Sequence, residues 1–236
     1  MMTFYQMLAP YYDEIFPANE KQIKFIASYL QKGSSILDVG AGTGNVAKAL
    51  VQNGFTVTAM EPDKTLAVKI LEKATVYEEA FSVYTLGMQQ IENVPRVFDG
   101  IYCIGNTLVH LENIEEITDF ICRSYKKLKE NGKLIIQIVN YEKVLGKNNF
   151  KFPVLETEHF SFKRDYKIEG ERVLFTATLN IGDKEVSNSI LLYPITREQL
   201  LPMLKECGFR TVETFRNFEK ESYLPNGSAL VLVATK

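Results

Sequence analysis

The residues best suited to chemistry form a glycine loop, Asp38-Val39-Gly40-Ala41-Gly42-Thr43-Gly44-Asn45, which follows a short β-branched run. Glycine lets the main chain turn tightly and approach a ligand closely. The spacing is GxGxG rather than the GxGxxG that places a pyrophosphate at a helix N-terminus. Asp38 puts a carboxylate at the entrance of the loop, which disfavours phosphate and favours a cationic ligand that carries an amino group.

Glu61 ends the next apolar run, residues 56–61, and has two carboxylate oxygens that can accept hydrogen bonds from two ribose hydroxyls. S-adenosylmethionine satisfies both features, because it has a sulfonium, an ammonium, a ribose and an adenine but no phosphate. The sequence therefore predicts this cofactor. The alternative for the loop is a tight turn without a ligand, which the combination of Asp38 and Glu61 disfavours.

The elements that must position these residues alternate in type along the first half of the chain. Strands are predicted over 34–40, 56–61, 81–86, 98–104 and 133–139, and helices over 19–31, 43–53, 63–74 and 113–129, with Gly132 in a turn. Such alternation is typical of a parallel sheet that is covered by helices on both faces. Ligands bind at the carboxyl edge of such a sheet, where the glycine loop and Glu61 are expected.

The pattern changes after Val144. Three runs within residues 154–193 have the composition of strands, and Gly170 and Gly182 stand in the turns between them. We expect an antiparallel meander here. A helix begins at Thr196, and two further strands are predicted near 210–218 and 228–235.

Four segments, LDVGAGTGN, TAMEPD, FDGIYCIGNTLVHL and LKENGKLIIQIVN, resemble the class I S-adenosylmethionine-dependent methyltransferases. The resemblance covers about 1–145 and 190–236. It implies an α/β, Rossmann-like sheet of seven strands in the order 3-2-1-4-5-7-6, with strand 7 antiparallel and an antiparallel β insertion after strand 5. It divides the chain into a cofactor-binding domain (1–145 and 194–236) and an inserted lid (146–193).

The resemblance assigns cofactor contacts by position. Asp38 would serve the methionine end, the glycine loop the backbone cradle, and Glu61 the ribose. The residues expected to contact the cofactor are Tyr12, Asp38, Gly40, Ala41, Gly42, Gly44, Asn45, Glu61, Pro62, Met88, Gln89, Ile104 and Gly105. Tyr12 belongs to a Tyr-Asp pair that would cover the cofactor; the alternative is an N-terminal helix that packs on the sheet.

One segment departs from the family pattern. Relatives often have Gly-Asp-Met after the third strand, whereas this chain has Leu86-Gly87-Met88-Gln89. Met88 can still pack on the adenine ring, or it can belong to the core. The polar contact to the adenine amino group must then come from Gln89, the backbone or water.

The methyl acceptor is expected beside Asn106, which follows the fourth strand. The strings IGNTLVHL and Val139-Asn140-Tyr141-Glu142 are similar to the glycine and sarcosine N-methyltransferase branch, which implies a small amine acceptor. Asn106 and Tyr141 are therefore candidates for catalysis and substrate binding. A hydroxyl acceptor would need a general base, and His110 is the best candidate; the alternative is a helix-start residue bonded to the backbone.

Arg164 lies in the meander and could clamp a substrate carboxylate with two hydrogen bonds. The alternative is a solvated surface arginine. Arg172 offers the same chemistry in a less favourable position.

Composition limits the other classes of protein. The chain has 236 residues, of which 46% are hydrophobic and 24% charged, and a net charge of -2, which argues against nucleic acid as a partner. No run approaches the ~20 apolar residues of a membrane span. The three cysteines, Cys103, Cys122 and Cys207, are far apart, without a CxxC pair. This pattern predicts neither a disulfide framework nor a metal site, and it favours the cytoplasm.

The sequence thus predicts a cytoplasmic methyltransferase that uses S-adenosylmethionine and acts on a small molecule such as an amine or an amino acid. Alternatives are an NAD-dependent oxidoreductase, which the GxGxG spacing disfavours, and a regulatory protein that binds the cofactor without turnover. A methyltransferase for macromolecules is disfavoured by the predicted lid. The oligomeric state is not set by any feature of the sequence.

Overall fold

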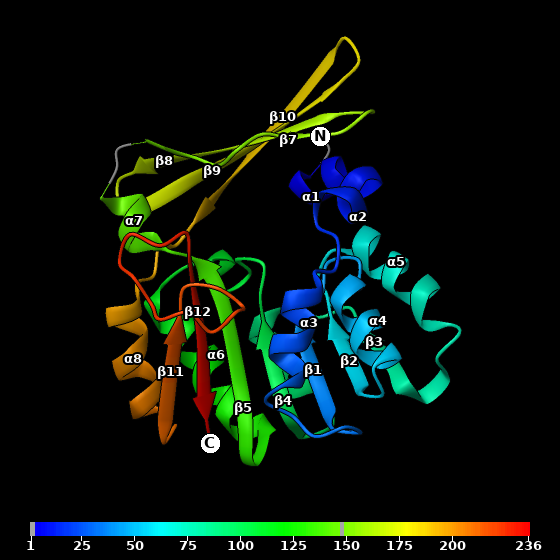
Figure 1. The fold of residues 1–236 in the computed structure, drawn as a ribbon, viewed down its shortest axis with the longest axis vertical. Helices are drawn as coiled ribbons and strands as arrows, with labels where there is room; N and C mark the ends of the chain where they lie inside the picture. Colours follow the sequence, from blue (N-terminus) through cyan, green and yellow to red (C-terminus); the bar gives the residue numbers. More distant parts are fainter. Residues whose placement is uncertain (1–2, 147–148) are drawn as a thin grey trace.

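The structure, a computed structural model, describes residues 3–146 and 149–236, with the side chains of 149–151 excluded. Its main sheet has the order β11-β12-β5-β4-β1-β2-β3 (Figure 1). The strands are β1 (Ser35–Val39), β2 (Thr56–Met60), β3 (Phe81–Tyr84), β4 (Phe98–Cys103), β5 (Leu128–Val139), β11 (Thr211–Phe215) and β12 (Ala229–Thr235). β11 and β12 are the sixth and seventh strands of this sheet, so the predicted order 3-2-1-4-5-7-6 is confirmed. β12 runs antiparallel to β5 and β11, which confirms the antiparallel seventh strand.

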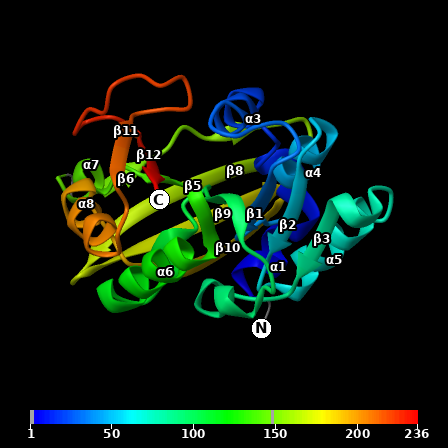
Figure 2. The ribbon, with the colours of Figure 1, turned by 90° about the horizontal axis from the view of Figure 1, so that it is seen from below.

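Helices cover both faces of the main sheet, as Figure 2 shows from below. One face carries α3 (Glu20–Ala27), α4 (Asn45–Gln52) and α5 (Lys64–Ala74), and the other carries η3 (Met88–Asn93), α6 (Ile114–Lys127) and α8 (Arg197–Glu206). Strand residues alternate between the two cores: Ile36 belongs to the first and Leu37 to the second. Four of these helices, α3, α5, α6 and α8, begin where a side chain accepts a first-turn N–H; the capping residues are Asn19, Asp63, Asn113 and Thr196.

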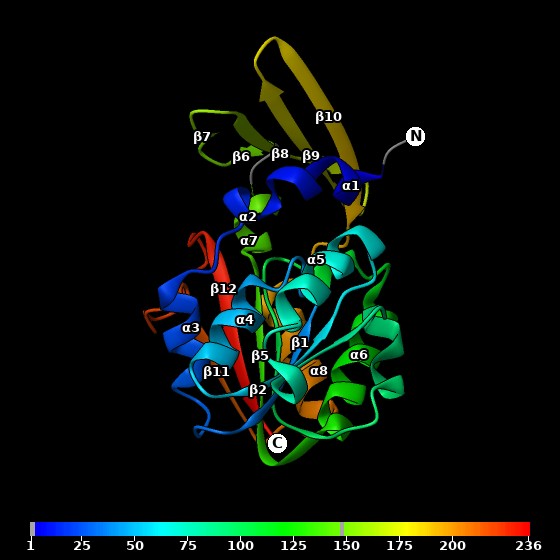
Figure 3. The same cartoon turned by 90° about the vertical axis from the view of Figure 1, so that its right-hand side faces the viewer.

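A second, antiparallel sheet lies beyond the carboxyl edge of the main sheet (Figures 1 and 3). Its strands are β6 (Asn149–Lys151), β7 (Leu155–Glu156), β8 (Ser161–Glu169), β9 (Arg172–Ile181) and β10 (Lys184–Leu192). The predicted antiparallel insertion after strand 5 is confirmed, and Gly170 and Gly182 stand in its turns with positive φ. The short β6 and the preceding helix α7 (Tyr141–Leu145) are not predicted, and residues 147–148 of the expected 146–193 segment lie outside the described part.

The first described residues form what we call the N-terminal cap, residues 3–16. It contains α1 (Phe4–Leu8), the single turn η1 (Ala9–Tyr11) and α2 (Tyr12–Ile15). The cap lies between the second sheet and the helices of the main domain (Figure 3), where α1 contacts β10 and α5. The N-terminal helix thus packs on the insertion and on a flanking helix.

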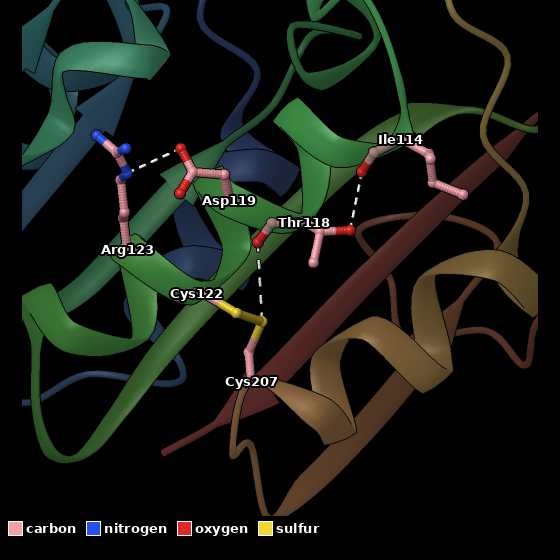
Figure 4. Close-up of a disulfide and its surroundings, with 6 residues drawn as sticks. All are labelled: Ile114, Thr118, Asp119, Cys122, Arg123 and Cys207. Carbon is pink, nitrogen blue, oxygen red and sulfur yellow. Dashed lines mark hydrogen bonds and ion pairs between the residues drawn. A yellow bond between two sulfur atoms is a disulfide. The ribbon is translucent and has the colours of Figure 1, made fainter.

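Two local expectations are wrong. Gly132 lies inside β5 rather than in a turn, because β5 begins at Leu128 directly after α6, with a register shift in its pairing to β4. In addition, Cys122 and Cys207 form a disulfide although 85 residues separate them (Figure 4). α6 and α8 pack side by side, which brings the two Cα atoms to 4.8 Å. Cysteine usage therefore does not support a reducing compartment.

No helix in the described ranges is long and apolar enough to cross a membrane. Among the same residues, no group of three His, Cys, Asp or Glu side chains could hold a metal ion.

Candidate functional site

The glycine loop connects β1 to α4 with three residues in the left-handed region. Gly40, Gly42 and Gly44 have φ of +74°, +60° and +77°. A Cβ built on Gly42 would lie 2.6 Å from the Tyr12 hydroxyl oxygen, and one on Gly40 would lie 2.2 Å from the Thr107 methyl carbon. Both the backbone conformation and the close neighbours therefore require glycine here.

Glu61 joins the loop after β1 to the end of β2. Its Oε2 accepts a hydrogen bond from Gly42 N at 2.8 Å, and its Oε1 accepts one from Asp63 N at 2.9 Å. The side chain is 5% exposed, and burial raises its pKa to about 7 although these two bonds act in the opposite direction. Each carboxylate oxygen keeps acceptor capacity beyond its one backbone bond, which suits a pair of ribose hydroxyls.

Asp38 is the second buried acid of the site, with 3% of its surface exposed. Burial raises its pKa to about 8; interaction with the Tyr102 hydroxyl lowers it, and the charge of Glu61 adds to the rise. The raised pKa values of Asp38 and Glu61 show that the site has too little positive charge to stabilise both carboxylates in the ionised form. A ligand with ammonium and sulfonium groups supplies that charge, so the residues fit S-adenosylmethionine.

The expected adenine contacts lie together at the end of β3. A Cβ built on Gly87 would lie 3.1 Å from Gln89 Oε1 and 3.9 Å from Pro62 Cβ. Pro62 and Gln89 are exposed, and Gln89 Nε2 donates to Glu116 at 3.3 Å. Met88 is buried in the same core cluster as Ile91, which favours the core alternative for this residue.

Tyr12 projects from the cap onto the glycine loop. Its hydroxyl oxygen and two of its ring carbons are the nearest neighbours of a Cβ built on Gly42. Burial, together with the nearby carboxyls of Glu61, Asp38 and Asp13, raises the pKa of Tyr12. Tyr12 therefore lies directly against the glycine loop.

Asn106 and Tyr141 meet at the carboxyl edge although they are 35 residues apart. Asn106 Nδ2 donates to the Tyr141 hydroxyl at 3.1 Å, and Asn106 Oδ1 accepts from Val139 N at 3.0 Å. Asn106 has a φ of +70°, and the preceding Gly105 N donates to Gln137 Oε1 at 2.8 Å. These bonds fix the segment after β4, including Ile104 and Gly105, against β5.

His110 ends a single turn, η4 (Leu108–His110), and its Nε2 lies 3.0 Å from the Tyr5 hydroxyl of the cap. Burial lowers the pKa of His110 to about 4, so its imidazole is neutral near pH 7. The His110 imidazole is thus bonded to a side chain, and not to the backbone as the alternative predicted. Tyr5 was not among the residues predicted for the site; the only signal in the sequence was its closeness to Tyr11 and Tyr12.

Arg164 lies on β8, on the same face as Phe162 and Tyr166. Its Cζ stacks over Phe152 at 4.5 Å from the ring centroid and lies 5.7 Å from that of Phe162. Its Nε is buried without a hydrogen-bond partner among the described residues, and burial lowers its pKa. Arg164 is therefore not a solvated surface side chain.

A family model described as a methyltransferase domain matches residues 11–170, which is more than half of the chain. The chain belongs to this methyltransferase family. The methyltransferase has the class I fold and uses S-adenosylmethionine as its cofactor.

Curated relatives and solved structures agree with this assignment. A glycine/sarcosine N-methyltransferase from Aphanothece halophytica is 25% identical over 90% of this chain and 80% of its own length. The CcbJ methyltransferase from Streptomyces caelestis has a TM-score of 0.83 at 20% identity and covers 96% of this chain and 95% of its own. CalS10 is an amino pentose methyltransferase from Micromonospora echinaspora that was solved with S-adenosylmethionine bound. It has a TM-score of 0.71 at 17% identity and covers 99% of this chain and 98% of its own.

Proposed function

We propose that this methyltransferase transfers a methyl group to the nitrogen of a small molecule that carries both an amine and a carboxylate. The observation that carries the proposal is Arg164, a half-buried cation on the inner face of the second sheet whose Nε has no hydrogen-bond partner among the described residues. An acceptor carboxylate would satisfy that donor and neutralise the charge. The relatives named glycine/sarcosine N-methyltransferases support an acceptor of this class.

The cofactor half of the site consists of the glycine loop, Asp38 and Glu61. Bound S-adenosylmethionine would supply a methyl group on a positively charged sulfur, which is open to direct displacement. The loop would hold the methionine part by its backbone, and Glu61 would hold the ribose. Pro62, Gly87 and Gln89 would line the adenine, and Tyr12 would cover the cofactor from the cap and exclude water.

The acceptor half would be organised by Asn106, Tyr141, His110 and Arg164. Arg164 would hold the carboxylate, and the bonded pair of Asn106 and Tyr141 would orient the amine toward the methyl group. The nitrogen lone pair of the held amine would form the new N–C bond, and the electrons of the broken C–S bond would stay on sulfur. The extra proton of the amine leaves through water or the neutral His110 imidazole.

The low pKa of His110 also supports nitrogen rather than oxygen as the acceptor. A hydroxyl must lose its proton in the displacement and needs an effective base, whereas a neutral amine already has a free lone pair. An imidazole with a pKa of about 4 is a weak base for a hydroxyl.

We also propose that residues 146–193 act as a lid over the site. A covered site suits a small acceptor better than a protein chain or a nucleic acid.

The test is a methyl-transfer assay with S-adenosylmethionine and matched acceptors: an amino acid, the same amine without its carboxylate, and a hydroxy acid. Mass spectrometry should show one added methyl group on the amino acid, at a lower KM than for the amine alone. Arg164→Met should raise the KM for the amino acid about tenfold or more, since a hydrogen bond between charged groups is lost. The KM for the amine without a carboxylate should not change.

Arg172→Met is the matched control, because Arg172 lies in the same sheet at the start of β9 and should leave both KM values unchanged. Arg164→Lys keeps the charge but loses the planar guanidinium group with its paired donors. Its KM for the amino acid should lie between those of Arg164→Met and Arg172→Met. Methylation of the hydroxy acid alone, or equal effects of Arg164→Met on both amines, would contradict the proposal.

A further inference from the structure

We propose that Lys73 is a positioning residue that latches the N-terminal cap onto the glycine loop through Asp13, and that this latch controls the release of the cofactor. The inference rests on the proposed assignment of the glycine loop as the cofactor site. It concerns a residue of α5 that lies outside the four quoted motif segments.

The Lys73 ammonium group makes three hydrogen bonds, one to the cap and two to the glycine loop. Its Nζ donates to Asp13 Oδ2 in the cap at 2.9 Å, to the Thr43 carbonyl oxygen in the glycine loop at 2.9 Å, and to Asn45 Oδ1 at 2.7 Å. An ammonium group has three protons, so its donor capacity is filled. The Lys73 side chain is 18% exposed, in contrast to the solvated lysines of ordinary surface ion pairs.

Asp13 completes the connection from the cap side. Its Oδ1 accepts hydrogen bonds from the Thr43 hydroxyl and, at 3.1 Å, from Asn45 Nδ2. Partial burial acts to raise the pKa of Asp13, but the bonds from Thr43 and Lys73 keep it below its usual value. Asn45 Nδ2 also donates to the carbonyl oxygen of Phe16 at 3.2 Å, so the end of the cap is held as well.

The latch acts on the cofactor site because Asp13 is next to Tyr12, whose ring lies against Gly42. Apart from the Tyr5–His110 bond and the contact of α1 with α5, the cap packs on the second sheet through aromatic rings, for example Tyr11 with Phe160 at 5.0 Å and Phe16 with Phe162 at 5.9 Å. These contacts leave the cap attached to the lid when the latch opens. Opening at Asp13 would therefore lift Tyr12 from the loop and expose the cofactor.

The first experiment measures cofactor binding. Lys73→Met removes the donors but keeps an unbranched side chain that is one atom shorter. It should raise the Kd for S-adenosylmethionine about tenfold, equal to about 1.4 kcal/mol, mainly through faster release, with kcat at saturation unchanged. Lys69→Met is the matched control: Lys69 lies one turn earlier in α5 and makes no hydrogen bond or ion pair with the described residues.

The second experiment observes the cap directly and needs no cofactor. The chain has no tryptophan, so Phe16→Trp introduces a single tryptophan at the end of the cap, which can be excited selectively over the tyrosines. Added to Phe16→Trp, Lys73→Met should increase quenching of the tryptophan by acrylamide. In the chain that keeps Phe16, Lys73→Met should speed amide hydrogen exchange over residues 3–16. Lys69→Met should change neither measurement.

A double-mutant cycle tests whether Lys73 acts through Asp13. Asp13→Asn should weaken binding by itself, and combining it with Lys73→Met should add little, because both remove the same contact. Additive effects, a weaker affinity without any change in the cap, or equal effects of Lys69→Met would each overturn the latch. If the wild-type chain bound no S-adenosylmethionine, the proposed cofactor site would fail, while faster exchange of the cap in Lys73→Met would still support the latch.

Discussion

Glu61 Oε2 accepts a hydrogen bond from the backbone N–H of Gly42 at 2.8 Å, which connects the acid that ends β2 to the loop that follows β1. The bond crosses 19 residues of sequence and lies at the carboxyl edge of two adjacent parallel strands. It fixes the carboxylate beside the glycine backbone before any ligand arrives. A preformed acceptor of this kind lowers the cost of ordering the site on binding.

Glu61→Gln should weaken S-adenosylmethionine binding by about 1–3 kcal/mol, the range for a lost hydrogen bond to a charged group. Glutamine keeps one acceptor oxygen, so it cannot serve the backbone and both ribose hydroxyls. Calorimetric titration with the cofactor and with its demethylated product measures the loss. Glu79→Gln, at an exposed position, is the control, and an unchanged affinity in a folded Glu61→Gln protein would contradict the ribose role.

Cofactor binding should release protons near pH 7. In the free protein, burial raises the pKa values of Asp38 to about 8 and of Glu61 to about 7, so both are partly protonated there. A bound cation favours the ionised carboxylates and lowers both values, so affinity should rise between pH 6 and 8. Calorimetry in buffers of different ionisation enthalpy should show the release, and Asp38→Asn should reduce it. Heats that do not depend on the buffer would contradict this prediction.

The same shift predicts how the stability of the free protein varies with pH. An acid whose folded pKa is raised stabilises the fold below its unfolded pKa, about 3.9 for Asp, and this contribution is lost as pH rises through 8. His110 acts in the opposite direction between pH 6.5 and 4, because its folded pKa is lowered. The difference in unfolding free energy between wild type and Asp38→Asn, measured in urea at several pH values, isolates Asp38. If the unfolding free energies of wild type and Asp38→Asn changed with pH in the same way, the raised pKa of Asp38 would be contradicted.

His110→Ala should reduce kcat more than cofactor affinity if the imidazole accepts the acceptor's proton. The expected loss is at most about 100-fold, the lower end for such groups, because the base is weak. No inflection near pH 6.5 should appear in the rate, since the imidazole stays neutral above pH 5. Tyr5→Phe removes the hydrogen bond to Nε2 and should lower kcat by a smaller factor. His159→Ala is an exposed control, and an unchanged kcat in His110→Ala would leave His110 a structural role only.

The Cys122–Cys207 disulfide should stabilise the fold. Because it closes a loop of 85 residues, its removal by the double substitution Cys122→Ser and Cys207→Ser should cost about 2–4 kcal/mol in unfolding free energy. Reductant should produce the same loss in wild type and none in the double variant. Thiol titration of the unfolded chain should find only Cys103 before reduction. Three titratable thiols in the unreduced, freshly purified protein would contradict the bond.

The parts of this site that depend on local sequence were predictable. Glycines 40, 42 and 44 have backbone conformations that other residues avoid, so their spacing in the chain already indicates the loop. Apolar periodicity set the strands and helices, and the strand order followed from the family resemblance. Asn106 and Tyr141 could be paired in advance because both follow adjacent strands of a parallel sheet.

Only the tertiary structure brought together the pairs that lie far apart in the chain. Tyr5 meets His110 across 105 residues, Asp13 meets Lys73 across 60, and Cys122 meets Cys207 across 85. None of these pairs has a spacing that a helix or strand would impose, so no local rule could reveal them. The pKa values of Asp38 and His110 likewise depend on burial, which arises only when the sheet, the cap and the insertion pack against one another. The sequence determined which groups the chain carries and on which elements, and packing decided which of them meet and in what charge state.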